Sequence, residues 1–260
     1  MDKQLSLIYF SATDTTAKVV KEVANSINNE FKEYNITYPD YRQDSLNFDS
    51  NDIVIVGVPV YAGRVPQFLI DYFKKLKGNN TLAVFIVVYG NRDYDDALLE
   101  LKDTFEENGF IGIAGGAFIG EHSYTSKVAA GRPDENDLKI AEIFGTKINE
   151  KLSIGDDFTK SELVVKGKYP YKERTSSILM APVTNDKCIN CGICAEHCPM
   201  NAISKDDFKE ADSTKCIRCC SCIKRCPVNA KSINHETFAK ITQMLLDKCT
   251  LHRHEPEYFI

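Results

Sequence analysis

Residues 188–199 read CINCGICAEHCP and residues 216–227 read CIRCCSCIKRCP, so the spacing C-x2-C-x2-C-x3-C-P occurs twice, 28 residues apart (216 − 188 = 28). Three thiolates spaced this closely can bind one face of a 4Fe-4S cubane, while the fourth, which precedes proline, reaches the neighbouring cluster. That arrangement needs two copies of the run, and the chain has two. The spacing therefore decides the fold of this part of the chain and predicts two 4Fe-4S clusters.

The crossing of the fourth cysteine defines two ligand sets, each with three cysteines from one run and one from the other. The predicted sets are Cys188, Cys191, Cys194 and Cys226 for one cluster, and Cys216, Cys219, Cys222 and Cys198 for the other. Zinc is one alternative, but zinc sites usually combine two separated C-x2-C pairs in a closed tetrahedron. A disulfide framework is another, and it is typical of small secreted chains.

The two runs and their flanking residues resemble bacterial two-cluster ferredoxins. In the repeat, Cys220 aligns with Gly192 and not with a ligand, so we expect a spare thiol there. Cys249 is expected to be buried as a small apolar residue. Basic residues beside the ligands, such as Lys224 and Arg225, are solvated charges by default, with contact to a partner or tuning of the clusters as the alternative.

The cysteines also divide the chain into parts. All ten lie after residue 187, and an apolar content of 43% can supply the earlier part with an ordinary hydrophobic core. A length of 260 residues suits about two domains. We expect a first domain at 1–154, a connector at 155–180, a cysteine-rich domain at 181–235, and a terminal helix with a polar tail at 236–260.

Charge and hydropathy narrow the class of protein. The net charge is −5 and the 32 basic residues are scattered, so we do not expect a nucleic-acid partner. The first residues show no basic segment followed by a cleavage site. Apolar runs fall short of the roughly 20 residues that span a bilayer. We therefore expect a cytoplasmic protein without a membrane segment.

The first 120 residues contain four apolar segments that we predict to be strands, at 5–10, 53–58, 82–89 and 110–120. Continuous β-branched residues in the second and third of these indicate burial on both faces, as in a parallel sheet. Residues 35–41 are expected to add a short edge strand. Helical spacing of apolar residues between the strands completes the alternation. The prediction is an α/β fold with a doubly wound, five-stranded parallel sheet, followed by a small α+β cluster-binding domain.

In such a sheet the ligand site lies beyond the carboxyl ends of the strands. The first loop in that position contains Ser11, Ala12, Thr13, Asp14, Thr15 and Thr16, whose hydroxyls and helix-start amides can donate to a phosphate. It resembles the phosphate loop of flavodoxins, T-x-T-G-x-T, which holds the phosphate of FMN. Asp14 departs from that pattern, because its carboxylate would repel the phosphate unless the side chain turns away or caps the helix. The plainer interpretation is that Ser11 or Thr13 only caps the helix.

Two further loops follow the next strands. The loop of Gly90, Asn91, Arg92, Asp93 and Tyr94 is similar to the flavodoxin loop G-D-S-S-Y, a resemblance that implies stacking of Tyr94 on the flavin ring. The loop of Pro59, Val60, Tyr61, Ala62 and Gly63 offers Tyr61 for the other face. Tyrosines at strand ends also cover core edges. His122 is interpreted as a satisfied loop histidine, with proximity to flavin or substrate as the alternative.

Taken together, the chain resembles the fused flavodoxin-ferredoxin proteins of anaerobes, called ferrodoxins. The resemblance implies an iron-sulfur flavoprotein that passes electrons between two 4Fe-4S clusters and FMN, with a redox partner protein or a small-molecule acceptor. The alternative is a ferredoxin-type carrier whose first domain binds no flavin and serves as a docking module. Asp14 favours this alternative, and neither interpretation identifies a catalytic residue.

Overall fold

The strands of the first domain form one sheet in the computed structural model, which describes residues 3–155, 158–160, 162–174 and 178–260. The sheet order is β2-β1-β3-β4-β5-β8, and the first five strands are parallel. They are β1 (Gln4–Tyr9), β2 (Lys32–Asn35), β3 (Asp52–Pro59), β4 (Thr81–Tyr89) and β5 (Phe110–Ile119). The predicted fold class is confirmed. The order reverses around β1 and β3, which places a ligand crevice at the carboxyl ends of these strands.

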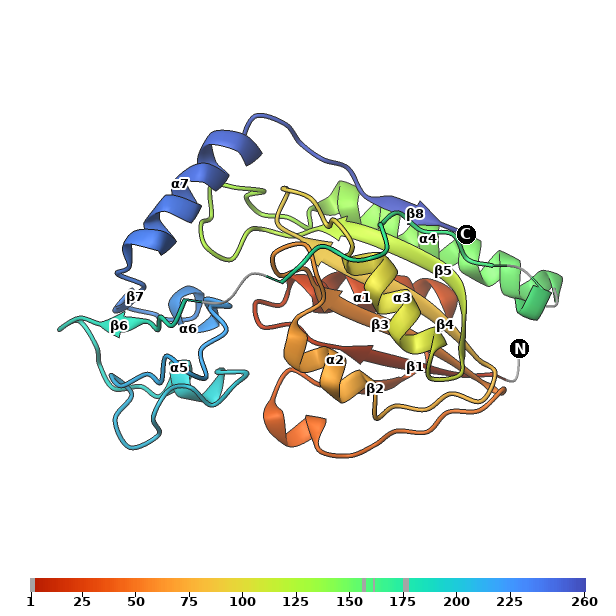
Figure 1. Ribbon diagram of the computed structural model, residues 1–260, viewed down its shortest axis with the longest axis horizontal. Coiled ribbons are helices and arrows are strands. Elements are labelled where there is room, and N and C mark those ends of the chain that lie inside the picture. Colours follow the sequence, from red (N-terminus) through yellow and green to blue (C-terminus); the bar gives the residue numbers. More distant parts are fainter. Residues whose placement is uncertain (1–2, 156–157, 161, 175–177) are drawn as a thin grey trace.

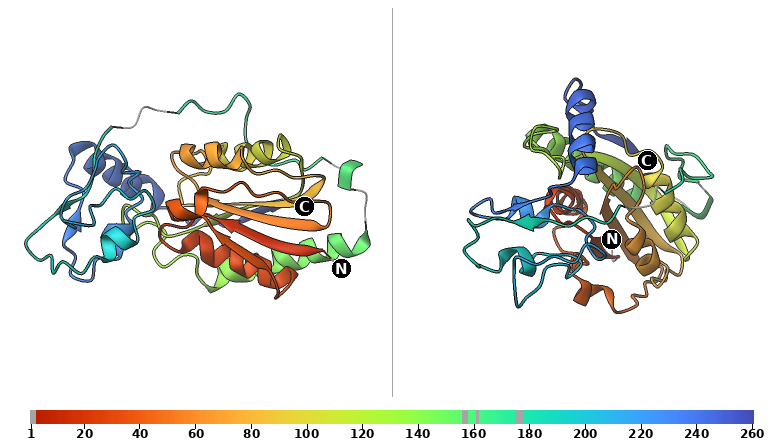
Figure 2. Two further views of the ribbon diagram at one scale, coloured as in Figure 1. Left: turned by 90° about the horizontal axis from the view of Figure 1, so that it is seen from below. Right: turned by 60° about the vertical axis from the view of Figure 1, so that its left-hand side comes forward.

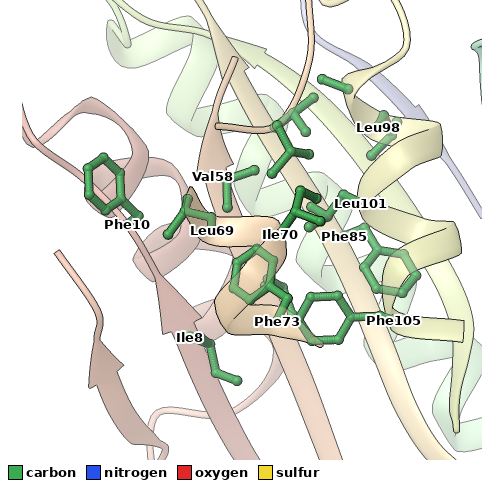
Figure 3. Close-up of a cluster of buried hydrophobic side chains, with 14 of the residues drawn as sticks. Ile8, Phe10, Val58, Leu69, Ile70, Phe73, Phe85, Leu98, Leu101 and Phe105 are labelled. Atoms are coloured by element: carbon green, nitrogen blue, oxygen red, sulfur yellow. The ribbon is translucent and has the colours of Figure 1, made fainter. Parts of the chain in front are cut away.

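Helices cover both faces of the sheet (Figure 2). On one face lie α1 (Thr15–Ile27) and α4 (Glu135–Ile154), and on the other lie α2 (Gln67–Phe73) and α3 (Ala97–Glu106). Figure 3 shows the core beneath α2 and α3, where Phe73, Phe85 and Phe105 are fully buried. Each buried phenylalanine contributes about 1.5–3 kcal/mol of stability. These two cores fix the sheet, and the sheet fixes the loops at its carboxyl end.

The edge strand β2 ends earlier than the predicted segment at 35–41. Pro39 instead opens a short 3-10 helix, η1 (Pro39–Arg42), because its fixed φ and missing N–H suit a helix start better than a strand. The edge position itself agrees with the prediction.

The C-terminal tail returns to the sheet as a sixth strand. After α7 (Glu236–Cys249), strand β8 (Glu257–Phe259) pairs antiparallel with β5, as Figure 1 shows. Asn91, in the loop after β4, holds the tail: its Nδ2 donates to the carbonyls of Cys249 and His252 at 2.7 Å each, and its Oδ1 accepts from the His254 N–H at 3.1 Å. A polar tail was predicted from the sequence, so this strand is an addition to the five expected.

The connector between the domains lies along α3 where the structure describes it. Backbone N–H groups of Lys168 and Lys172 donate to the two carboxylate oxygens of Asp96 at 2.9 and 2.6 Å. Arg174 donates to Glu100, which is 4% exposed. The short η2 (Phe158–Lys160) belongs to the same segment. Residues 156–157, 161 and 175–177 of the predicted connector lie outside the described residues, as do residues 1–2.

The cysteine-rich domain is small and lies beyond the carboxyl ends of the strands (Figure 1). It contains the two-stranded pair β6 (Val183–Thr184) and β7 (Lys231–Ser232), with the short helices α5 (Ile193–Glu196) and α6 (Ser221–Lys224). Among the residues that the structure describes, no helix has the length and apolarity needed to cross a bilayer.

Replacing Asn91 with alanine is expected to release the tail from the sheet. The substitution leaves two carbonyls and one amide of the tail without their buried partner, which costs about 1–3 kcal/mol. Amide hydrogen exchange in β8 should accelerate while exchange in β4 stays slow.

Asn29→Ala is the matched control, because Asn29 is exposed and its side chain has no hydrogen bond within the described residues. Exchange in β8 that is equally slow in both variants and in the parent protein would show that Asn91 does not hold the tail.

Candidate functional site

Two cavities in the cysteine-rich domain are each lined by four of the predicted ligands. The first has an empty volume of about 400 Å³ and is lined by Cys198, Cys216, Cys219 and Cys222. The second, of about 320 Å³, is lined by Cys188, Cys191, Cys194 and Cys226. These are the two crossed sets that the spacing predicts. In the described part of the chain no three His, Cys, Asp or Glu side chains converge on a single metal ion. The thiols instead surround cavities, which suits a polynuclear cluster.

The repeat in sequence is also a repeat in backbone geometry. Gly192 and Cys220, at matching positions, precede α5 and α6 with left-handed φ angles of 78° and 60°. The sulfurs of Cys198 and Cys226 each accept a backbone N–H at 3.2 Å, from Ala202 and Ala230 respectively. The amides thus orient each crossing thiol in the same way.

Burial raises the pKa of three thiols that line the first cavity as predicted ligands, Cys216, Cys219 and Cys222. It raises the pKa of Cys219 to about 12. Without metal these thiols therefore stay protonated at neutral pH. Coordination deprotonates a thiol outright, so loading of this cavity releases protons.

Both cysteines outside the ligand sets are buried. Cys220 is 3% exposed and lines the first cavity beside the ligands. Cys249, on α7, packs with Val128 and Leu245 in a small apolar cluster. The structure gives Cys249 the apolar environment expected from the sequence.

The hydroxyl loop lies between β1 and α1. Ser11 is buried, with its N–H donated to the Thr37 hydroxyl at 2.9 Å and its Oγ accepting the Ala17 N–H at 3.0 Å. Ser11 therefore shapes the loop and caps an amide of the helix. By contrast, the hydroxyls of Thr13, Thr15 and Thr16 form no hydrogen bond with any described residue. Ala12, between these groups, is also buried.

Thr16 shows how the loop presents these groups. The residue is 1% exposed, and its methyl group faces Gly57 of β3. No buried side-chain oxygen of the described residues lacks a hydrogen-bond partner, so the Thr16 hydroxyl reaches solvent. The amides at the start of α1 have no partner within the helix. Unpaired hydroxyls and amides at a helix start form a donor set suited to a phosphate.

Asp14 adopts the backbone conformation that glycine favours, with φ of 67°. Its side chain makes no hydrogen bond to the helix start. It turns instead toward the cysteine-rich domain, where both carboxylate oxygens accept from Nη2 of Arg225 at 2.8 and 2.6 Å. At this position the loop therefore has a conformation that suits the glycine of the flavodoxin pattern, and it carries a negative charge there.

The loop after β3 makes a tight turn toward the cysteine-rich domain. Tyr61 and Arg64 exchange backbone hydrogen bonds at 2.9 and 3.1 Å, and Ala62 and Gly63 between them have positive φ angles. Tyr61 is partly buried in the same apolar cluster as Cys219. Burial, with contributions from Cys219, Cys220 and Tyr124, raises the pKa of Tyr61 well above its usual value. Tyr61 is therefore close enough to the first thiol set for Cys219 and Cys220 to influence its pKa. The other two loop residues, Pro59 and Val60, are also partly buried.

The loop after β4 corrects the prediction for Tyr94. This residue is 1% exposed, its hydroxyl donates to Glu257 of the tail at 2.7 Å, and the Lys166 Nζ lies 4.8 Å from the ring centroid. The ring is part of the core, which leaves no face for stacking on a flavin in this structure. Asn91, also assigned to the cofactor, is committed to the tail. Gly90 is kept small by His122, whose ring would lie 2.4 Å from an added Cβ.

Two residues that follow β5, His122 and Tyr124, lie next to the loops described above. Burial lowers the pKa of His122 to about 4, and its Nδ1 accepts the Tyr124 N–H at 3.1 Å, so His122 is a neutral loop histidine. Tyr124 packs against Phe238 of α7 with ring centroids 4.5 Å apart and ring planes tilted by 37°. Its position near Tyr61 could not be predicted, because it depends on contacts between distant segments.

The two domains meet through residues that neighbour the cysteine ligands. Polar contacts across the interface include Asp14–Arg225 at 2.6 Å, Glu121–Lys224 at 2.6 Å, the Tyr38 hydroxyl with Nδ1 of His197 at 2.9 Å, and Nη2 of Arg42 with the Pro199 carbonyl at 2.7 Å. Apolar contact by Cys219 and Ile217 completes the interface.

Fold and site together define a two-domain protein in which a cysteine-rich, cluster-binding module lies at the ligand edge of a doubly wound sheet. Comparison with family models gives the same division: a flavodoxin domain matches residues 6–120, and a 4Fe-4S binding domain matches residues 181–204. The chain is therefore a fusion of these two domains, as its resemblance to flavodoxin-ferredoxin proteins predicts. This combination gives the chain an electron-transfer role.

Solved structures offer likenesses of low identity. The flavodoxin of Fusobacterium nucleatum bound to flavin mononucleotide is 14% identical over 57% of this chain and 98% of that chain, with a TM-score of 0.40. Flavodoxin 1 from Bacillus cereus is 15% identical over 57% and 98%, with a TM-score of 0.40. Rubredoxin oxygen:oxidoreductase from Desulfovibrio gigas is 15% identical over 62% and 38%, with a TM-score of 0.42. At these scores the fold assignment rests on the strand order and the family models. A comparison with curated proteins finds no match.

Crossed ligand sets predict that loss of Cys226 affects the cysteines of the other run, whereas ligand sets of four consecutive cysteines do not. Replacing Cys226 with serine should weaken the cluster held by Cys188, Cys191 and Cys194, so these thiols should become open to alkylation, as mapped by mass spectrometry. Iron should fall from about eight atoms per chain toward four.

Cys220→Ser is the matched control and should keep its iron, since Cys220 belongs to neither ligand set. Alkylation of Cys216, Cys219 and Cys222 in Cys226→Ser would instead indicate uncrossed ligand sets.

Proposed function

We propose that this protein is an electron-transfer iron-sulfur flavoprotein, in which two 4Fe-4S clusters exchange electrons with FMN. The observation that carries the proposal is the shared packing of Cys219 and Tyr61. Cys219 is 9% exposed and belongs to the apolar cluster against which Tyr61 packs after β3, at the ligand edge of the sheet. A ligand of one proposed cluster and a side chain of the proposed flavin site thus pack in one apolar cluster, and Cys219 contributes to the raised pKa of Tyr61.

The donor sets suit both kinds of cofactor. Four thiols around each cavity match a cubane with four iron atoms. Unpaired hydroxyls of Thr13, Thr15 and Thr16 at the start of α1 match a phosphate. When bound, the clusters supply one-electron transfer and FMN supplies one- or two-electron steps.

The two thiol sets differ in how far their cysteines are exposed to solvent, and this difference suggests a role for each set. Cys191 of the second set is exposed, whereas Cys219 of the first set is buried against the flavodoxin domain. We assign the second set to exchange with a redox partner protein and the first set to exchange with the flavin. Buried apolar packing around Cys219 excludes water from the junction.

For the flavin ring, the proposal depends on Tyr61 and the backbone of Ala62 and Gly63. Tyr94 and Asn91 have no part in it, because both are engaged by the C-terminal tail. A small-molecule acceptor at the flavin would meet the neutral side chain of His122. The redox chemistry requires reduced thiols, so a cytoplasmic location remains part of the proposal.

The alternative is a ferredoxin-type carrier whose first domain only docks the cysteine-rich domain. It is favoured by the packing of Ile217 and Cys219 against the sheet edge that would receive the ring. Purification without oxygen, followed by release and quantification of flavin, separates the two functions. A fully metallated protein that contains no FMN and takes up none in solution supports the docking function and ends the flavoprotein proposal.

Substitution of Tyr61 gives a second test. Tyr61→Leu should weaken FMN binding by about three- to tenfold, because an aromatic contact contributes about 0.5–1.5 kcal/mol beyond area burial. Fluorescence titration of the metallated protein measures the change.

Tyr94→Phe is the matched control. It removes a hydroxyl bonded to the tail and keeps the buried ring, so FMN affinity should not change. Equal weakening in both variants would indicate that neither tyrosine contacts the ring directly.

A further inference from the structure

We propose that Arg225 of the cysteine-rich domain completes the phosphate site of the flavodoxin domain, where it neutralises Asp14 and donates a hydrogen bond to the phosphate of FMN. This inference rests on the proposed function, since it concerns the same flavin. It adds a residue that lies 211 positions from the loop in sequence and belongs to the other domain.

The negative charge of Asp14 is the reason why the phosphate site needs a further cationic residue. It lies between Thr13 and Thr15, and its side chain is 59% exposed. A carboxylate so close to a phosphate repels it, and the repulsion grows as the bound group excludes water. The loop itself offers no cation at residues 11–16 to balance this charge. The positive end of the α1 dipole is the only compensation within the loop.

Arg225 is oriented toward the loop by its own domain. Its Nε donates to the Ser221 hydroxyl at 3.2 Å, and Ser221 is 1% exposed, with its hydroxyl bonded to the His197 carbonyl. Nη2 holds both oxygens of Asp14. The planar guanidinium is thus fixed at two points, so its remaining edge has a defined direction.

That remaining edge is available. Among the described residues none accepts a hydrogen bond from Nη1 of Arg225, and the side chain is 25% exposed. A guanidinium carries five N–H donors in a rigid fork and binds phosphate and carboxylate oxygens strongly. One Arg225 can therefore hold Asp14 through Nη2 and a phosphate oxygen through Nη1.

The loop supplies an independent indication that a ligand binds here. Thr16 is 99% buried as a residue, yet its hydroxyl has no partner in the described chain and reaches solvent. Thr16 follows Asp14 by two residues, and Asp14 holds the guanidinium of Arg225, so an unpaired hydroxyl and an unpaired guanidinium edge belong to the same loop region and suit a shared anion. The same loop lies inside the matched flavodoxin domain.

The arrangement couples flavin binding to domain docking. If Arg225 contacts both Asp14 and the phosphate, FMN stabilises the docked domain by the same free energy that docking adds to FMN binding. Riboflavin, which lacks the phosphate, gains nothing from the phosphate contact of Arg225. The comparison of the two flavins therefore isolates the phosphate contact.

The test is flavin titration of the full-length, metallated protein after removal of bound flavin. Arg225→Ala should weaken FMN binding by about tenfold or more beyond any change that it causes in riboflavin binding, the loss expected for a charge-assisted hydrogen bond. Arg225→Lys keeps the charge and should recover part of the FMN affinity. In an Asp14→Gly background, the loss caused by Arg225→Ala should be smaller and still measurable.

Lys224→Ala is the matched control for docking, since Lys224 bridges the same domains through Glu121. It should affect both flavins equally. The inference is overturned if Arg225→Ala binds FMN as tightly as the parent protein, or if it weakens FMN and riboflavin to the same extent. Failure of the parent protein to bind either flavin is a different result, which overturns the proposed function itself. Iron content of each variant confirms that the clusters remain loaded.

Discussion

The crossing of the fourth thiol between the two halves of the repeat is the constraint on which the cysteine-rich domain depends. Its helices α5 and α6 have four residues each, too short to be stable alone. Its one apolar cluster contains three buried residues, Cys194, Ala195 and Ile203. A domain of this size needs covalent or metal staples in place of a core. Cys198 and Cys226 each line the cavity of the other half, so in the proposed clusters neither half would keep all four ligands if the halves separated.

The interface with the first domain is built from residues that neighbour the predicted cysteine ligands. His197, Pro199, Cys219, Lys224 and Arg225 all lie within two residues of a ligand or are one. His197 and Pro199 meet the segment of Tyr38 and Arg42 around η1, whereas Lys224 meets Glu121 after β5 and Arg225 meets Asp14 before α1. The residues that would position the proposed clusters are thus the neighbours of those that dock the domain.

Local signals in the sequence predicted the parts of this protein that depend on local physics. Strand β4 is buried along all nine residues, so its apolar run was sufficient. The cysteine spacing likewise predicted both sets of thiols that line the cavities. Tyr94 failed as a stacking candidate because its partner, Glu257, lies 163 residues away in the tail. Strand β8 was missed for a related reason: three residues carry no periodicity, and their pairing is set by the exposed edge of β5. Contacts between segments that are far apart in the sequence leave no pattern near either residue.

Asp14 shows how a position can keep its geometry while its chemistry changes. The loop needs a residue with positive φ before α1, and aspartate is among the few side chains besides glycine that tolerate this conformation. The substitution therefore preserves the path of the backbone and adds one negative charge. In an isolated flavodoxin domain that charge would oppose a phosphate, yet in this chain it faces Arg225 of the second domain. The electrostatics of the loop are consequently a property of the fused chain. In the proposed phosphate site, an anion that would bind unfavourably within one domain binds favourably only when the other domain is docked, and this dependence would give the fusion a physical role of its own.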